Sequence, residues 1–128
     1  MNVVVDASVI TDIVLPGPDA SRIRDRLVSH SLYAPQLMAV ECQSVIRRHL
    51  IAGALSESSA EDGLALLRDL PVLWIDIPPL LEVAWRYRSY VSAYDAVYIA
   101  AAVGLGAPLY TRDRRLVRAV PNIAVPVP

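Results

Sequence analysis

Four acidic residues lie where the surrounding sequence would otherwise carry apolar side chains: Asp6, Glu41, Asp95 and Asp113. Asp6 ends the β-branched run at 3–5, and Asp113 comes shortly after the apolar segment 108–110. A β-branched run of this kind predicts a strand buried on both faces of a parallel sheet. We therefore expect both acids at the carboxyl ends of strands, the edge at which open α/β sheets bind ligands.

The other two acids lie on segments with the periodicity of helices. Leu37 and Val45 flank Glu41 at four-residue spacing, so this acid interrupts an apolar stripe. Asp95 stands near the start of an alanine-rich helical segment, where an acid is also favoured by the helix dipole. We expect both helices to lean over the strand edge that carries Asp6 and Asp113.

Four carboxylates at one edge repel one another. Two like charges about 4 Å apart cost roughly 4 kcal/mol at an effective dielectric constant near 20. Shared protons or a divalent cation would remove that cost, and oxygen ligands without paired His or Cys favour Mg²⁺ or Mn²⁺ over zinc. Such an ion lowers the pKa of a bound water molecule, so the set predicts a metal site at this edge of the sheet.

Ordinary structural roles also explain these residues one by one. Asp6 or Ser8 would cap the helix that follows, since both residue types favour the N-cap. The hydroxyls of Ser8 and Thr111 would either orient neighbouring carboxylates or cap a local turn. The remaining acids, including Asp12 and Asp19, are interpreted as solvated surface.

All 12 basic residues are arginine, because the chain contains no lysine. This composition excludes a P-loop and a Schiff-base site, and it gives a phosphatase with Asp6 as nucleophile little support. Arg112, Arg114 and Arg115 adjoin Asp113 and are candidates for phosphate contacts, although charged runs usually form a solvated face.

The aromatic residues and histidines have two interpretations. Tyr94 and Tyr98 flank Asp95 and would either stack on a base or pack in the core or a subunit interface. Trp74 and Trp85 are expected to be packing residues. Both histidines, His30 and His49, are expected at the surface.

The alternation of predicted elements indicates how the acids are positioned. Strands are expected near 2–6, 32–34, 72–76, 108–110 and 123–127. Helices are expected near 7–15, 19–29, 36–52, 57–69, 78–90, 93–106 and 113–119. This order predicts an α/β fold with a central, mainly parallel sheet covered on both faces. The last strand contains proline and is expected at the sheet edge.

Length and composition narrow the class of protein. The 128 residues are expected to form one domain, residues 1–128. Hydrophobic residues make up 55% of the chain, which predicts an apolar subunit or partner interface. No apolar run is long enough to span a membrane, and no signal peptide is expected. The one cysteine, Cys42, permits no internal disulfide, fits a reducing cytoplasm and is expected in the core.

Four ordered motifs, VVVDAS, ECQSVIRR, AYDAVYIAAA and LYTRD, closely resemble those of PIN-domain ribonucleases, specifically VapC-type toxins of bacterial toxin–antitoxin pairs. The resemblance extends over essentially the whole chain. It implies a three-layer α/β/α sandwich, and it carries the catalytic and metal-binding quartet of the family onto Asp6, Glu41, Asp95 and Asp113. The serine and threonine of the family pattern match Ser8 and Thr111.

The same resemblance implies an activity and partners. It implies a Mg²⁺-dependent endoribonuclease that hydrolyses RNA phosphodiester bonds, a homodimer, and a VapB-type antitoxin that inserts an arginine among the acids. Two alternatives remain open: a non-catalytic PIN-fold binding module, and a metal-dependent nuclease that acts on DNA. The complete quartet argues against the first, whereas the metal chemistry does not separate RNA from DNA.

Overall fold

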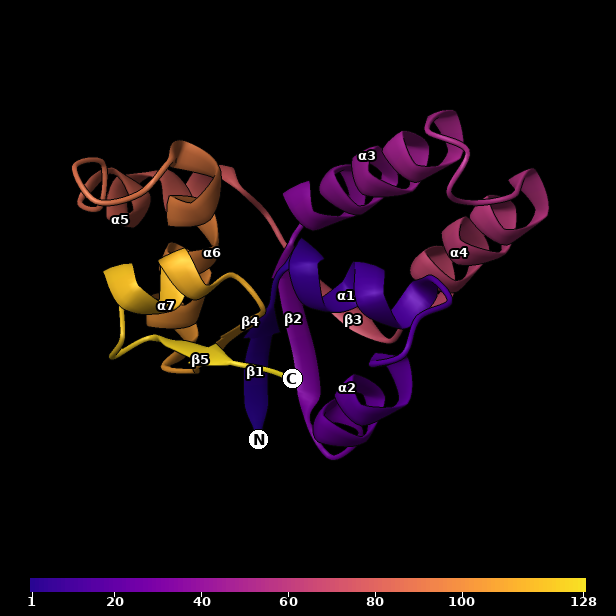
Figure 1. Ribbon diagram of the computed structural model, residues 1–128. Coiled ribbons are helices and arrows are strands. Elements are labelled where there is room, and N and C mark those ends of the chain that lie inside the picture. Colours follow the sequence, from indigo (N-terminus) through magenta and orange to yellow (C-terminus); the bar gives the residue numbers. More distant parts are fainter.

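A sheet of five parallel strands runs through the centre of the protein, in a computed structural model that describes residues 1–128 (Figure 1). The strands are β1 (Asn2–Val5), β2 (Ser31–Pro35), β3 (Val72–Ile75), β4 (Leu109–Thr111) and β5 (Ala124–Pro126). Their order is β3-β2-β1-β4-β5, and Val4 pairs with Tyr33 on one side and Leu109 on the other. The predicted α/β class and the edge position of the last strand are confirmed.

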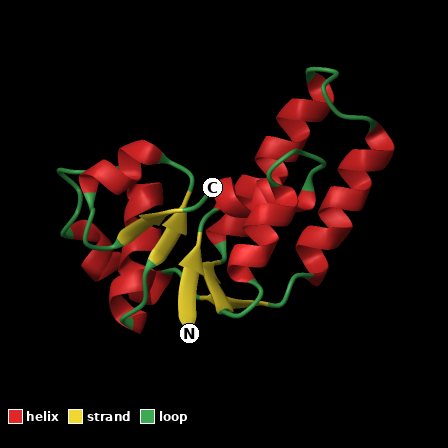
Figure 2. Cartoon of the chain, turned by 60° about the horizontal axis from the view of Figure 1, so that its bottom comes forward, coloured by secondary structure: helices red, strands yellow, loops and turns green.

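Helices cover the sheet on both sides. They are α1 (Ala7–Val14), α2 (Ala20–Leu27), α3 (Leu37–Ile51), α4 (Glu57–Asp69), the 3₁₀ helix η1 (Pro78–Leu80), α5 (Leu81–Trp85), α6 (Ala93–Leu105) and α7 (Arg114–Ala119). Helices α1 to α4 gather on one side of β1 and β2, and α5 to α7 gather on the other (Figures 1 and 2). This is the predicted three-layer arrangement.

The core follows from the apolar patterns of the sequence. Val3, Val4 and Val5 are fully buried because β1 is the central strand and has helices on both faces. Cys42 is also fully buried, as expected. In α6, residues 96–102 are all buried, and the small alanines among them allow the helix to pack closely against β1 and β2.

The prediction of one helix over 78–90 was wrong. The segment forms η1, the short α5 and a series of turns, in which the amide of Arg86 donates to Val83 O and that of Tyr90 to Tyr87 O. These bonds link residues three apart, and aromatic residues and serine are weak helix formers. The chain thus enters α6 through an irregular loop, residues 86–92, and Ser92 caps that helix.

Three predictions about aromatic residues and histidines need correction. Trp74 and Trp85 were expected to pack, but 39% and 67% of their surfaces are exposed, so neither is a core residue of this chain. His30 is half-buried and meets Tyr110 edge to face, with ring centroids 5.8 Å apart. His49 is exposed as expected. No helix has the length and the apolar character needed to cross a membrane.

Candidate active site

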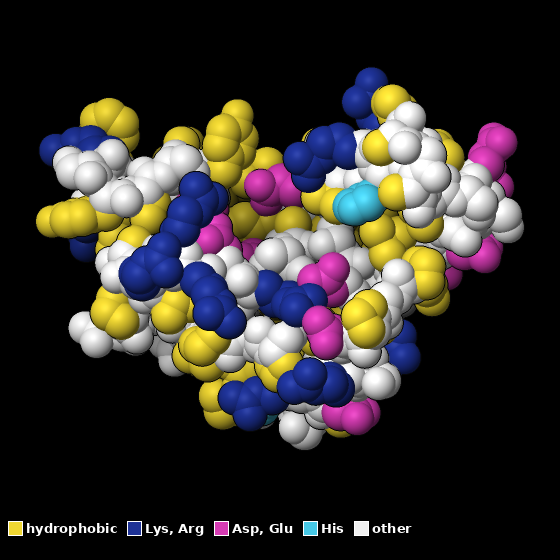
Figure 3. Space-filling model, in the orientation of Figure 1, with side chains coloured by type: hydrophobic (Ala, Val, Ile, Leu, Met, Phe, Trp, Pro, Cys, Tyr) yellow, Lys and Arg dark blue, Asp and Glu magenta, His cyan; other side chains and the backbone are white.

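The carboxyl ends of β1 and β4 carry two of the four acids. Asp6 follows β1 directly and Asp113 follows β4 by two residues. Because β1 and β4 are neighbouring parallel strands, these ends lie side by side. Glu41 comes from α3 and Asp95 from the first turn of α6. Acidic side chains are visible in the hollow between α3 and the α6–α7 side of the molecule (Figure 3).

Asp6 is a buried carboxylate held by four hydrogen bonds. Its Oδ1 accepts from the amides of Ser8 (3.1 Å) and Val9 (3.3 Å) and from the Ser8 hydroxyl (2.5 Å). Its Oδ2 accepts from the Thr111 hydroxyl at 2.5 Å. Burial raises the pKa of Asp6 to about 6, although these hydrogen bonds favour the charged form. Asp6 therefore caps α1, as one interpretation of the sequence predicted. Burial also makes its ionised form costly.

The two hydroxyls also fix the loop after β4. Ser8 Oγ accepts from the amide of Arg112 at 2.9 Å, and Thr111 Oγ1 accepts from the amide of Asp113 at 3.0 Å. Asp113 in turn caps α7, where its Oδ1 accepts from the amide of Arg115 at 2.9 Å. The positions of Asp6 and Asp113 are thus coupled through Ser8 and Thr111.

Glu41 is held by a tyrosine from the opposite layer. The hydroxyl of Tyr98 donates to Glu41 Oε1 at 2.5 Å, and only 2% of Tyr98 is exposed. Burial and this hydrogen bond raise the pKa of Tyr98. Burial, then the charges of Glu41 and Asp6, raise the pKa of Cys42 to about 12. Glu41 and Asp6 therefore act on the same buried groups.

Asp95 and Asp113 line one cavity, of about 390 Å³, between α6 and α7. The pKa of Asp95 is raised by burial and then by the charge of Asp113, while a hydrogen bond with Ser92 and the charge of Arg115 oppose the rise. Arg115 Nη2 lies 3.5 Å from Asp113 Oδ2, and 84% of the Arg115 side chain is exposed. One exposed cation thus adjoins both carboxylates.

The four carboxylates are suitable ligands for a divalent cation, although their side chains do not point to one common position. All four candidate ligands are carboxylates, which Mg²⁺ and Mn²⁺ prefer. A bound cation would stabilise the ionised forms of Asp6 and Asp95, whose pKa values are raised by burial. No three Asp, Glu, His or Cys side chains lie close enough to hold one ion as they stand. Asp6 Oδ2, with one hydrogen bond, keeps a lone pair free for an ion.

Arg112 has an internal role that the sequence analysis missed. Its Nη1 donates to Asp12 of α1, and its Nη2 donates to Asp19, at the start of α2, at 2.8 Å. The interpretation of Asp12 and Asp19 as merely solvated acids was wrong. Both pairs join residues more than 90 positions apart, a separation that carries no local signal in the sequence. Of the three arginines near Asp113, Arg114 and Arg115 are exposed.

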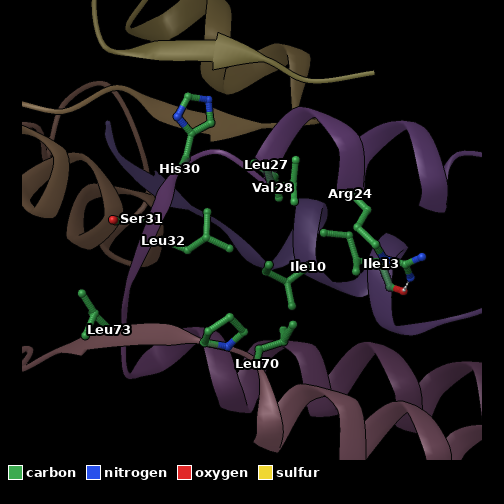
Figure 4. Close-up of a pocket in the computed structure, with 11 residues that line it drawn as sticks. Ile10, Ile13, Arg24, Leu27, Val28, His30, Ser31, Leu32, Leu70 and Leu73 are labelled. Atoms are coloured by element: carbon green, nitrogen blue, oxygen red, sulfur yellow. Dashed lines mark hydrogen bonds between the residues drawn. The ribbon is translucent and has the colours of Figure 1, made fainter.

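A larger cavity, of about 560 Å³, lies between α1, α2 and the strands and is lined mainly by apolar side chains (Figure 4). Ile10, Leu27, Leu32 and Leu70 face one another there, and Arg24 turns toward the carbonyl of Ile13 at 3.5 Å. It contains no carboxylate. Its lining therefore suits apolar contacts rather than hydrolysis.

Residues 3–120 match the PIN domain family. The chain belongs to that family. The resemblance read from the four motifs is confirmed, because curated relatives of this PIN domain are ribonucleases named VapC. One of them, ribonuclease VapC3 of Mycobacterium tuberculosis, is 36% identical over 121 residues, which are 94% of this chain and 88% of the relative.

Solved structures with the same fold agree with this assignment. PAE2754 from Pyrobaculum aerophilum superposes with a TM-score of 0.77 at 23% identity, over 99% of this PIN domain and 90% of that chain. A chain of a toxin–antitoxin complex from Klebsiella pneumoniae superposes with a TM-score of 0.62 at 16% identity, over 96% and 95% of the two chains. At these identities the superpositions show the fold.

Proposed function

We propose that this PIN domain is a metal-dependent endoribonuclease toxin that hydrolyses RNA phosphodiester bonds and is neutralised by a cognate VapB-type antitoxin. The observation that carries the proposal is geometric: Asp6 and Asp113 follow the carboxyl ends of the neighbouring strands β1 and β4, and the Thr111 hydroxyl forms hydrogen bonds with both residues. Burial also raises the pKa of Asp6. Carboxylates that are costly to ionise alone suit an edge where a cation binds. The 36% identity to ribonuclease VapC3 supports the same activity.

The proposed cation is Mg²⁺, with Mn²⁺ as a substitute, held by Asp6 and Asp95 and by Glu41 and Asp113 directly or through water. When bound, such an ion lowers the pKa of a coordinated water and neutralises charge on the phosphate. The protein's own residues prepare this site. Ser8 and Thr111 orient the Asp6 carboxylate, and Tyr98 orients that of Glu41.

Exposed arginines near the acids would reduce the electrostatic repulsion between the carboxylates and the phosphates of RNA. Arg114 and Arg115 on α7 are exposed beside Asp113 and are proposed phosphate contacts. Arg112 was predicted for the same role, but its guanidinium is engaged by Asp12 and Asp19. A phosphate would have to displace those carboxylates, so the proposal now rests on Arg114 and Arg115.

The test is cleavage of total cellular RNA by the purified protein with Mg²⁺, with EDTA, and in the variants Asp6→Asn and Asp95→Asn. Asp25→Asn is a matched control, because Asp25 lies on α2 and is an exposed acid with no side-chain hydrogen bond or ion pair. Discrete cuts are expected only with the metal and with both acids intact. Products that persist in EDTA or in both site variants would contradict the mechanism.

The same purified protein distinguishes the two alternatives, a DNA nuclease and a non-catalytic binding module. Single-stranded and duplex DNA serve as parallel substrates, and preferential cleavage of DNA would favour the DNA nuclease. A folded protein, freed of antitoxin, that binds RNA without cutting it under any metal would favour the binding module.

Partners are proposed from exposed apolar surface. The large side chains exposed in this chain include Val40, Ile51, Trp74, Leu81 and Trp85. In a chain that is 55% hydrophobic, we propose that some of these side chains are covered in a subunit or partner interface. We expect a homodimer in light scattering of the purified chain, and growth arrest on expression that the cognate antitoxin relieves.

A further inference from the structure

Tyr90, in the loop before α6, is an exposed aromatic residue at the edge of the candidate site. Fully 72% of its surface is exposed. It lines the cavity of about 390 Å³ that holds Asp95 and Asp113, and it also lines a neighbouring cavity of about 260 Å³ with Tyr87 and Pro121. Tyr90 is therefore shared by two hollows, and neither the motifs nor the acidic quartet accounts for it.

The two hollows differ in chemistry. The first contains the two carboxylates together with Arg115, whose side chain is 84% exposed and only 3.5 Å from Asp113. The second is lined mostly by hydrophobic residues, among them Val120 and Ile123. Tyr90 thus borders a hollow with charged groups, including an arginine that could contact a phosphate, and a second hollow with an apolar wall.

The size of the first hollow suits a small ligand. Cavities that hold small molecules commonly measure about 300 to 1,000 Å³, and this one falls at the lower end of that range. Exposed aromatic rings beside a basic side chain are the usual means of holding unpaired nucleotides, because every base has a face that can stack. A base inside a duplex has both faces covered and cannot stack in this way.

We infer that the cavity between α6 and α7 takes one unpaired nucleotide of the substrate, with its base stacked on Tyr90 and its phosphate against Arg115. The inference rests on the proposed ribonuclease function and names the residue that would hold the base. Tyr90 is then a specificity-determining residue, because stacking on its ring favours binding of an unpaired base close to the carboxylates.

The experiment measures binding separately from cleavage. A fluorescein-labelled single-stranded RNA hexamer is titrated with the full chain in EDTA, so that no cutting occurs, and fluorescence anisotropy gives Kd. Tyr90→Ala removes the ring, Tyr90→Phe keeps it, and Tyr94→Ala is the matched control. Tyr94 is 63% exposed and lies four residues away, but it lines neither cavity.

The expected result is a Kd about ten-fold weaker for Tyr90→Ala, within about two-fold for Tyr90→Phe, and unchanged for Tyr94→Ala. Arg115→Ala is expected to weaken binding and to reduce the slope of log Kd against log salt by about 0.7. A hexamer carrying 2-aminopurine should lose fluorescence on binding the natural chain and keep it with Tyr90→Ala. The duplex form of the hexamer should bind more weakly than the single strand.

Several outcomes would overturn the inference. Equal losses for Tyr90→Ala and Tyr94→Ala, no loss for Tyr90→Ala, equal binding of duplex and single strand, or no binding of the hexamer would each do so. Tighter binding of a DNA hexamer would assign the cavity to DNA instead. Metal-dependent cleavage of total RNA is scored in parallel, so an active enzyme with an unaffected Tyr90→Ala variant rejects the cavity while the ribonuclease stands.

Discussion

Thr111 and Asp6 are 105 residues apart in the sequence, yet the hydroxyl of Thr111 donates a 2.5 Å hydrogen bond to Asp6 Oδ2. Thr111 ends β4 and Asp6 follows β1, so the bond closes the gap between two neighbouring strand ends. The same hydroxyl accepts from the amide of Asp113. One threonine therefore sets the positions of two candidate metal ligands.

Thr111→Val should uncouple these two acids. It leaves the buried Asp6 Oδ2 without a donor and the Asp113 amide without an acceptor, so we expect a loss of about 2 kcal/mol in the free energy of unfolding. Thr11→Val is the control, because Thr11 is equally buried but bonds only to Ala7 O. The measurement is urea denaturation with and without Mg²⁺, and Thr111→Val alone should lose part of the stabilisation by metal. Equal metal responses in both variants would contradict the coupling.

Tyr98→Phe should release Glu41 without creating a cavity. The variant loses one hydrogen bond to a carboxylate, so we expect a loss of about 1.5 kcal/mol in stability and a lower kcat with little change in KM for RNA. Tyr110→Phe is a matched control, since Tyr110 is also buried but its hydroxyl makes no hydrogen bond. A fall in kcat of the same size for Tyr110→Phe would show that the effect is not specific to Glu41.

Stability without metal should fall as pH rises. Burial raises the pKa of Asp6 from 3.8 to about 6, so the folded state favours the protonated acid. The contribution of protonated Asp6 to the free energy of unfolding is about 3 kcal/mol. It is fully present below pH 4 and is lost as the pH rises through about 6. Burial and the charge of Asp113 raise the pKa of Asp95, which adds to the same trend.

The check is urea denaturation in EDTA between pH 4 and 7, with Asp6→Asn beside the natural chain. The variant should lose most of the slope with pH, and Mg²⁺ should recover stability in the natural chain near neutral pH. A flat profile for the natural chain would show that Asp6 ionises without cost.

Arg112→Ala should loosen the loop between β4 and α7. Its guanidinium bridges Asp12 and Asp19, and these groups are only partly exposed, so we expect a loss of about 1–2 kcal/mol that shrinks at high salt. Arg112→Lys should recover only part of it, because one ammonium cannot bridge both carboxylates as the fork does. Arg68→Ala, which removes an exposed pair with Asp69, should have no measurable effect. Full recovery with lysine would exclude the bridging role.

Local patterns in the sequence were sufficient for the elements and for the acids. The β-branched run at 3–5 and the alanine-rich segment at 93–106 are apolar at consecutive positions, a local pattern that predicts burial on all sides. Asp6 at a strand end and Asp95 at a helix start follow from the same patterns. The segment 78–90 was misjudged because weak helix formers leave the outcome to packing.

The sequence by itself thus determined the α/β fold and the parallel sheet, and it predicted four candidate acids, of which Asp6 and Asp113 follow strand ends. Only the tertiary structure decided which residues hold the acids Asp6 and Glu41, namely Thr111 and Tyr98. It also showed that Arg112 pairs with Asp12 and Asp19, outside the quartet. It placed Tyr90 in the lining of two cavities. The physical reason is that a hydrogen bond between side chains far apart in the chain depends on how helices cross the sheet. No spacing along one strand or helix records that geometry.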